Sequence, residues 1–354
     1  MYYAAPLLMQ DITQHVSELK SLLDSSSRIL ITSHISPDPD AVSSLLLFGE
    51  TITLNYPDKT IEMVLEEKPL EADFLRGFSD IKISNLADAA AEFKPDLLVI
   101  LDANSFSRVS RNESDRLKEV VANQSIKTAI IDHHEPAGKD NTDVYINQNS
   151  PAVVQDVYEV LFNHLNYKKP EDYAQTAMTG LYSDTGGFAY NNPRHSDTLK
   201  LADELLSAGA NIEIVRNNLY RYSETDLEVL GELATNTSHH DDYSYSFISD
   251  EFVDNWINGG KTAAELHMGT DGFVNGYLRN IGGRKWGFIV YKNVLSGEDI
   301  YSASFRSVGG VKDVAAIASQ LGGGGHKPAA GAKFQAKNIT DAIDKVKSTI
   351  RAPG

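Results

Sequence analysis

Four short segments of the sequence carry acidic residues and histidines of the kinds that bind metal ions. Carboxylate and imidazole ligands that face one cavity can hold one or two hard or borderline divalent cations. The chain has no cysteine, so disulfides, thiolate metal sites and cysteine nucleophiles are excluded. The candidate residues are His34, Asp38 and Asp40; Asp102; Asp132, His133 and His134; and Asp184.

Each segment alone also fits a plain structural explanation. Asp40 could cap a helix after an Asp-Pro turn, and Asp102 and Asp184 could each lie in a turn at the end of an element. The three ionisable residues 132–134 close an apolar stretch and are harder to explain by packing. Four such segments in one chain favour a shared chemical site over four independent turns.

Three of the four segments directly follow stretches of sequence that look like buried strands. The strand-like stretches are RILITSH, TIEMVLEE, DLLVILD and KTAIIDHH, and helical or apolar-periodic patterns separate them, among them residues 41–54, 72–78 and 111–121. This alternation predicts a doubly wound, mainly parallel α/β sheet. Ligands of such sheets bind beyond the carboxyl ends of the strands, so we expect the candidate residues to meet at one edge.

The rest of the chain predicts a second, smaller domain. Helical patterns dominate to about residue 240, and strand patterns return in YSYSFIS, KWGFIVYK and DIYSASFRS, followed by a glycine-rich turn at Gly322–Gly331 and a helix near residues 339–350. A chain of 354 residues suits two cores. We predict a first domain at residues 1–210, a helical connector at 211–240 and a mixed α/β domain at 241–354, with the active site in the cleft between the domains.

The motifs together resemble those of the DHH phosphoesterase superfamily. HISPDPDA, the strand-final Asp102, DHH and GLYSDTG occur in the order of that family, and GGGGHKPAAG is similar to the glycine-rich signature of the DHH-associated C-terminal domain. This signature is found in the branch with nano-RNases and 3′-phosphoadenosine 5′-phosphate (pAp) phosphatases. One departure is Pro39, which stands where the family commonly has glycine and removes an amide donor.

The resemblance implies a site for two divalent ions, with Mn2+ as the expected metal and Mg2+ or Co2+ as alternatives. Asp102 would bridge the two ions, and His134 would face the substrate phosphate, so that these two residues are the implied catalytic groups. Two ions that share a water can activate it and stabilise an in-line displacement at phosphorus. The implied ligands are His34, Asp38 and Asp102 for one ion, and Asp40, Asp102, His133 and Asp184 for the other.

The resemblance also implies where the substrate is recognised. Consecutive glycines let a backbone approach a phosphate or ribose closely, and an arginine offers a fork of donors that fits phosphate. The implied substrate contacts are Arg108, Arg306, Gly323, Gly324, Gly325 and His326.

The function that follows is hydrolysis of small nucleotides by a Mn2+-dependent phosphoesterase. Its substrates would be very short oligoribonucleotides, which release 5′-mononucleotides, or pAp. Phosphodiesterases for cyclic or linear dinucleotides share the same metal site and stay open as an alternative. A RecJ-like exonuclease and an inorganic pyrophosphatase fit less well, and a catalytically silent nucleotide-binding module would be expected to have lost ligands.

Composition bears on partners and location. The formal net charge is −17 and no run of Lys or Arg is present, which disfavours binding along long nucleic acid. The opening residues lack the basic and apolar regions of an export signal, and nothing resembles a membrane span. We expect a cytoplasmic protein that acts on small nucleotides away from membranes, with a homodimer as an open assembly state.

Overall fold

The computed structural model describes residues 12–351, except residues 70, 111, 135–141, 191, 220 and 297–298. The opening segment in which we expect no export signal therefore lies mostly outside the described residues. The chain forms two compact units, Met1–Arg221 and Tyr222–Gly354, each described by itself below. The division falls within residues 211–240, where the sequence predicts a connector.

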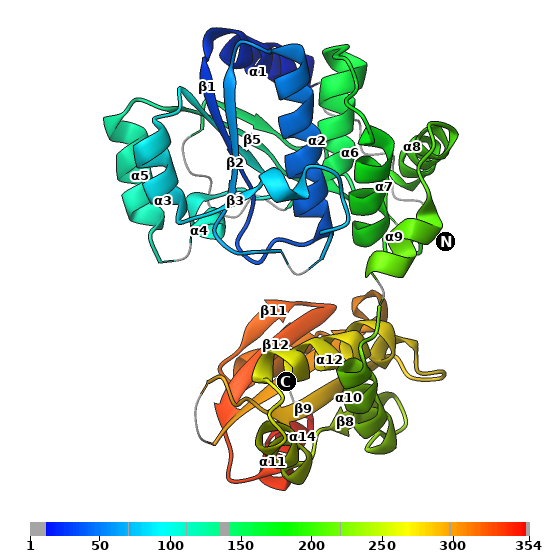
Figure 1. Cartoon of the computed structure of the whole chain (residues 1–354). Coiled ribbons are helices and arrows are strands. Elements are labelled where there is room, and N and C mark those ends of the chain that lie inside the picture. Colours follow the sequence, from blue (N-terminus) through cyan, green and yellow to red (C-terminus); the bar gives the residue numbers. More distant parts are fainter. Residues whose placement is uncertain are drawn as a thin grey trace. The chain divides into compact units, whose positions relative to one another are not determined.

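The first unit is built on a parallel sheet with the strand order β3-β2-β1-β4-β5-β6 (Figure 1). Every neighbouring pair of strands runs parallel. The predicted strands and the doubly wound α/β class are confirmed, whereas the short β3 and β6 gave no signal in the sequence. The strands are β1 (Arg28–Thr32), β2 (Thr60–Leu65), β3 (Lys82–Ile83), β4 (Leu97–Leu101), β5 (Lys127–Ile131) and β6 (Val144–Ile146).

Helices cover both faces of this sheet (Figure 1). Alternate residues of β1 and β4 point to opposite faces, so Ile29 packs with α1, α2, α6 and α7 while Leu30 packs with α3 and α5. The helices are α1 (Thr13–Ser25), α2 (Pro39–Asn55), α3 (Leu86–Phe93), α4 (Phe106–Val109), α5 (Ser114–Asn123), α6 (Val153–Tyr158), which continues as a π-helix at Glu159–His164, α7 (Tyr173–Asp184), α8 (His195–Ser207) and α9 (Ile212–Leu219).

One expected helical segment of the first unit is irregular instead. Residues 72–78 form turns that lead into a short 3-10 helix at Phe78–Asp80. Ala72 and Gly77 have positive φ angles of 70° and 79°, which no α-helix tolerates. The apolar spacing of this segment reflects packing of Ala72 and Leu75 against the core.

The second unit contains a mixed sheet with the strand order β11-β12-β10-β9-β8-β7 (Figure 1). Its strands pair antiparallel except β8 with β9, so the predicted mixed α/β class is confirmed. The strands are β7 (Ser238–His239), β8 (Tyr243–Phe247), β9 (Trp286–Lys292), β10 (Ile300–Ser307), β11 (Gly324–His326) and β12 (Ala329–Gln335). The helices are α10 (Glu224–Thr235), α11 (Asp250–Asn258), α12 (Ala263–Gly276), α13 (Val314–Gln320) and α14 (Ile339–Arg351).

The glycine-rich segment predicted as a turn is largely a β-hairpin. A Cβ atom at Gly323 would lie 2.2 Å from the carbonyl oxygen of Gly331, and one at Gly325 would lie 2.6 Å from the Cα of Ala330. These glycines therefore let β11 lie close against β12. In the part of the chain that the structure describes, no helix is long and apolar enough to cross a membrane.

Candidate metal centre

The strand order of the first sheet explains why the candidate residues meet. The order reverses between β1 and β4, and the crevice beyond such a switch point is where doubly wound sheets bind ligands. His34 follows β1 by two residues, Asp102 follows β4 directly, and Asp132 follows β5 directly. Ser33 fastens the ends of β1 and β4 by donating a hydrogen bond of 2.7 Å to the carbonyl of Leu101.

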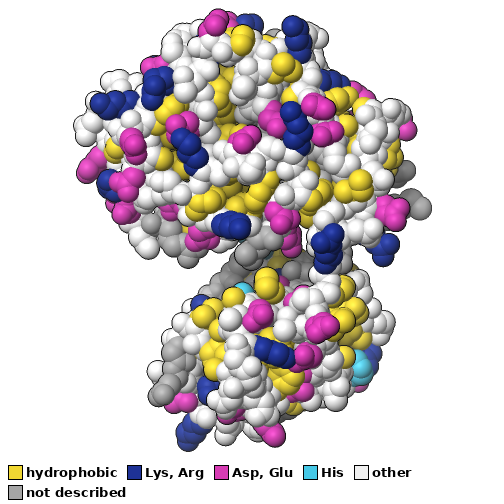
Figure 2. Space-filling view, viewed as in Figure 1, with side chains coloured by type: hydrophobic (Ala, Val, Ile, Leu, Met, Phe, Trp, Pro, Cys, Tyr) yellow, Lys and Arg dark blue, Asp and Glu magenta, His cyan; other side chains and the backbone are white. Residues whose placement is uncertain are grey.

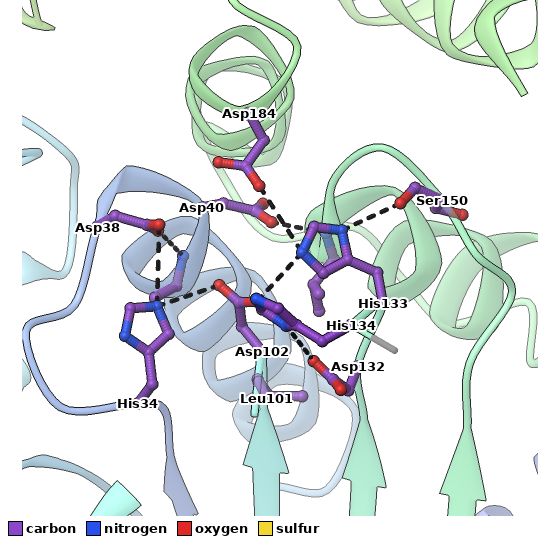
Figure 3. A network of polar contacts seen from close by, with 12 residues as sticks. His34, Asp38, Asp40, Leu101, Asp102, Asp132, His133, His134, Ser150 and Asp184 are labelled. Carbon is purple, nitrogen blue, oxygen red and sulfur yellow. Dashed lines mark hydrogen bonds and ion pairs between the residues drawn. The ribbon is translucent and has the colours of Figure 1, made fainter. Parts of the chain in front are cut away.

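His34, Asp38 and Asp102 form one group that could hold a metal ion, called the first ligand set below (Figure 3). The Nδ1 of His34 donates to the carbonyl of Ile35 at 2.8 Å, so Nε2 is the nitrogen that faces the site, and its lone pair can bind an ion once the proton on Nε2 is released. Nε2 lies 3.3 Å from Oδ2 of Asp102 and 3.8 Å from Oδ2 of Asp38. An imidazole fixed by a backbone carbonyl in this way is typical of a metal ligand.

Asp40, His133 and Asp184 form the second ligand set. The Nδ1 of His133 hydrogen-bonds with the carbonyl of Ser150 at 3.0 Å, and its Nε2 lies 3.8 Å from Oδ2 of Asp184. Asp184 is the last residue of α7, where the helix dipole repels a carboxylate. A cation would relieve that repulsion.

Asp102 lies between the two sets (Figure 3). Its Oδ2 faces His34, whereas its Oδ1 is buried, lies 3.6 Å from Nε2 of His133 and has no hydrogen-bond partner among the described residues. The backbone of Asp102 has a φ of 58°, the left-handed region that costs free energy for any residue with a side chain. A buried carboxylate with a strained backbone and one oxygen free of hydrogen bonds fits a bridging ligand.

The electrostatics of the site call for positive charge. Burial raises the pKa of Asp40 well above its usual range, and repulsion from Asp184 and Asp102 raises it further. Burial likewise raises the pKa of Asp184, with added repulsion from Asp38 and Asp102. Burial opposes the charge of His34, but hydrogen bonds with Asp102 and Asp38 outweigh it and raise its pKa to about 10. The donor set therefore fits two divalent cations.

His134 is held differently from the two other histidines. Its Nδ1 lies 2.8 Å from Oδ1 of the fully buried Asp132, and its Nε2 lies 3.3 Å from Nη2 of Arg108. The carboxylate behind Nδ1 orients the ring, and Nε2 accepts from Arg108, so that His134 and the guanidinium of Arg108 lie side by side at the site. We did not predict this role of Asp132, although its place in the DHH motif marks it.

The structure answers the question raised by Pro39. Pro39 occupies the first position of α2, where the missing amide proton has no helical partner anyway and the fixed φ angle suits the helix. The N-cap of α2 is Asp38, whose Oδ1 accepts a hydrogen bond of 3.0 Å from the amide of Ala41, and not Asp40 as the turn explanation would have it. Asp40 is fully buried and accepts from the amides of Val153 and Val154 at 2.6 and 3.1 Å.

In the second unit, the structure places the other predicted residues on one sheet. Arg306 pairs with Ala329, which pairs with His326 on its other side, so all three side chains point to the same face. Arg306 also hydrogen-bonds with the side-chain oxygen of Asn275. A cavity of about 500 Å³ lies further along this sheet, and its lining includes Ser304, Gly323, His267, Tyr291 and Lys333 but neither Arg306 nor His326.

Family models match both units of the chain. The DHH family, N-terminal domain, matches residues 28–181, and the DHHA1 domain matches residues 260–352. The chain belongs to the DHH superfamily. The first match contains the HISPDPDA and DHH motifs and Asp102 but ends before Asp184, and the second contains GGGGHKPAAG.

Similar proteins agree with this membership. The chain is 25% identical over 331 residues to the bifunctional oligoribonuclease and PAP phosphatase NrnA of Bacillus subtilis. The matched region covers 92% of this chain and 96% of that protein. It is 23% identical over 190 residues, 53% of this chain, to a probable manganese-dependent inorganic pyrophosphatase of Streptococcus agalactiae. The crystal structure of an exopolyphosphatase-related protein from Bacteroides fragilis has the same fold, with a TM-score of 0.81, 22% identity and coverage of 98% of this chain and 97% of that one.

Proposed function

We propose that this member of the DHH superfamily is a two-metal phosphoesterase for small nucleotides. It releases 5′-mononucleotides from very short oligoribonucleotides and dephosphorylates pAp. The position of Asp102, with one oxygen facing each ligand set, is the observation that carries the proposal. The similarity to the bifunctional oligoribonuclease and PAP phosphatase over nearly the full length of both chains supports the substrate class.

The first ion would be held by His34, Asp38 and Asp102, and the second by a set that shares Asp102. Such a pair of ions supplies the positive charge that activates a water and neutralises the phosphate. We propose Mn2+, with Mg2+ or Co2+ as alternatives, because mixed imidazole and carboxylate ligands suit it and a partial relative is described as manganese-dependent. The second set is Asp40, Asp102, His133 and Asp184.

His134 and Arg108 would bind the phosphate at this site. In the absence of substrate, Arg108 donates toward Nε2 of His134. A phosphate oxygen would accept from Arg108 instead, with His134 beside the same phosphate. Asp132 holds the ring in this orientation, because its Oδ1 accepts from Nδ1.

The second unit would hold the rest of the nucleotide. Arg306 and His326 are two strands apart on one sheet face, roughly 10 Å from each other at the usual strand spacing, with only the small Ala329 between them. We propose that they bind a phosphate or ribose, that Gly323, Gly324 and Gly325 provide close backbone approach, and that the cavity further along this sheet takes the nucleoside. That substrate lies in a cleft between the two domains stays a prediction.

The charge of the chain supports small substrates over long nucleic acid. On the face seen in Figure 2, Lys and Arg side chains are scattered among Asp and Glu rather than gathered in a stripe. Long single strands are usually bound along a continuous basic groove. Cytoplasmic location and a homodimer stay predictions.

Hydrolysis of a substrate panel tests the proposal. The panel contains pAp, pApA, a five-residue RNA, cyclic di-AMP and pyrophosphate, each with Mn2+. Release of AMP from pAp and the short linear substrates, lost in Asp102→Asn, is the expected result. Turnover of cyclic di-AMP or pyrophosphate alone would replace the proposed substrate class, and tight Mn2+ binding without turnover of any substrate would indicate a silent binding module.

A further inference from the structure

The segment from Ser150 to Asp156 contacts two ligands of the second set. The Ser150 carbonyl accepts from Nδ1 of His133, and the amides of Val153 and Val154 at the start of α6 donate to the Asp40 carboxylate. Within the described ranges of the chain, no hydrogen bond or ion pair joins this segment to His34 or Asp38. The orientation of the second set therefore depends on where this segment lies.

The same segment is fastened from its other side by Arg194. The guanidinium donates through Nη1 to Oγ of Ser150 and, at 3.3 Å, to Oδ1 of Asp156, and through Nη2 at 2.6 Å to Oε1 of Glu159. Ser150 in turn donates through Oγ to Asp156. Asp156 is fully buried and Arg194 is 8% exposed, so solvent does not replace these contacts.

A buried network of this kind contributes little net stability to a fold. Buried ion pairs lose hydration, and apolar residues of similar volume often stabilise a fold as well or better. Burial, together with repulsion from Glu159, raises the pKa of Asp156 to about 7 in spite of the hydrogen bond from Ser150 and the charge of Arg194. What the network does provide is a fixed position for the Ser150 carbonyl and for the start of α6.

We propose that Arg194 is a positioning residue that sets the geometry of the second metal site and leaves the first site unaffected. This inference rests on the proposed function, since it takes both ligand sets to hold ions. Arg194 touches no ligand itself. It acts through Ser150 on His133, and through Asp156 and the start of α6 on Asp40.

Metal binding without substrate tests this inference. Mn2+ is titrated into the full chain, and free Mn2+ is measured by electron paramagnetic resonance for wild type, Arg194→Met and Arg194→Lys. Wild type should bind two ions. Arg194→Met should bind one ion within about twofold of the wild-type affinity and the other at least about tenfold more weakly, the range seen when a residue behind a metal ligand is lost. Arg194→Lys keeps the charge but loses the forked donors of the guanidinium, so its affinity for the second ion should lie between those of wild type and Arg194→Met.

Arg116→Met is the matched control. Arg116 also bridges two carboxylates, those of Asp88 and Glu113, but it is exposed and lies on α5. Both ions should bind to this variant as to wild type. Thermal unfolding of each metal-free variant shows whether the fold is kept.

A second variant keeps the test decisive if Arg194→Met does not fold. Ser150→Ala retains the carbonyl that orients His133 but removes the hydroxyl through which Arg194 and Asp156 hold it, and it should weaken the second ion selectively by several-fold. Equal affinities in wild type and the folded variants, or equal weakening of both ions, would overturn the inference while leaving the two-metal function intact. A wild-type chain that binds fewer than two ions would instead overturn the proposed function and this inference with it.

Discussion

The two ligand sets of the candidate metal centre are assembled in different ways. In the first set, His34 and Asp38 lie four residues apart, and each is oriented by its own neighbourhood: His34 by the carbonyl of Ile35, and Asp38 by the helix that it caps. In the second set, His133 and Asp40 are oriented by backbone groups from Ser150 to Val154, far away in the sequence. Apart from the shared Asp102, the first geometry is therefore local, whereas the second depends on tertiary packing.

This difference predicts which substitutions should disturb each ligand set. A change in packing around α6 or α7 should disturb the second set long before the first, because only the second set receives its orientation from these elements. Asp102 is proposed to belong to both sets, so substitutions of Asp102 should weaken metal binding at both. The predictions below follow this order.

Asp102→Asn should have the largest effect, because it removes charge from both sets at once. Asparagine tolerates the left-handed φ of 58° better than alanine, so the fold should survive. We expect loss of both ions and a fall in turnover of more than about 100-fold, beyond the range for a residue behind a ligand. Metal titration and initial rates measure this. Retention of one tightly bound ion would contradict a bridging position.

The second largest effect expected is a dependence of metal affinity on pH, which should differ between the two sets. The pKa of His34 is raised to about 10, so below that pH the first set must release a proton to bind an ion. Its affinity should therefore fall as pH falls, by about tenfold for each unit between pH 9 and pH 6 if one proton is displaced. Asp40 and Asp184 also have raised pKa values, so binding at the second set should weaken with acidity as well.

Calorimetric titration in buffers of different ionisation enthalpy counts the released protons. His34→Gln should lose the proton release of the first set at the alkaline end of this range. A first-set affinity that does not vary from pH 6 to pH 9 would refute the assignment.

Gly180→Ala should damage the second set selectively. A Cβ atom there would lie 2.7 Å from Oδ1 of Asp40 and 2.9 Å from Cβ of Ser43, so α7 or the carboxylate must shift. Overpacking of this kind costs about 1–3 kcal/mol of unfolding free energy. We expect weaker binding of the second ion, measured by Mn2+ titration, together with a lower midpoint of thermal unfolding.

Gly231→Ala is the control for this change. Gly231 lies inside α10, and an added Cβ meets nothing within 4 Å. Alanine there should raise stability by about 0.5–1 kcal/mol through helix propensity, without any effect on metal binding. Equal behaviour of the two variants would show that contact with Asp40 is not what matters at position 180.

Arg306→Lys probes a region outside both sets. Lysine keeps the charge but loses the fork that binds phosphate through two donors. We expect KM for pAp to rise by about tenfold, the cost of roughly one charged hydrogen bond, while both ions bind as in wild type. Steady-state kinetics measure the change, and a fall in kcat with unchanged KM would argue against a role in binding.

Pro39→Gly should have the smallest effect on chemistry. Pro39 lies at the first position of α2, where glycine costs about 1 kcal/mol of unfolding free energy by loosening the unfolded chain. Metal affinity and turnover should stay within about twofold of wild type. A large gain in activity would mean that the proline restricts the first set after all.

The sequence predicts the first set better than the surroundings of the second. Residues at strand ends can be assigned to one edge because parallel topology sends them there, which is how His34, Asp102 and His133 were found. The backbone groups of Ser150, Val153 and Val154 carry no signal, since any residue has a carbonyl and almost any has an amide. Arg194 was missed for a related reason, because a lone arginine before a helix looks like a surface residue.

The sequence also predicts some elements of the fold and misses others. The long buried strands β1, β4 and β5 were readable from apolar runs, whereas the two residues of β3 were not. The glycines at 323–325 suggest a turn by composition, and only the partner strand reveals that they form the tight edge of a sheet. For residues 72–78 the prediction was wrong: the apolar spacing suggested a helix, but it does not reveal the positive φ angles that prevent one.

The spread of the ligands along the chain has a consequence for biosynthesis. The first of the proposed ligands is His34 and the last is Asp184, so 150 further residues must be made after the first before the second set can exist. At about 5–20 residues per second, this takes roughly 8–30 s on the ribosome. During that time the acidic loop after β1 holds only a fragment of a site. If the proposed ligands hold ions, loading of the full centre must therefore follow synthesis and folding of the first unit.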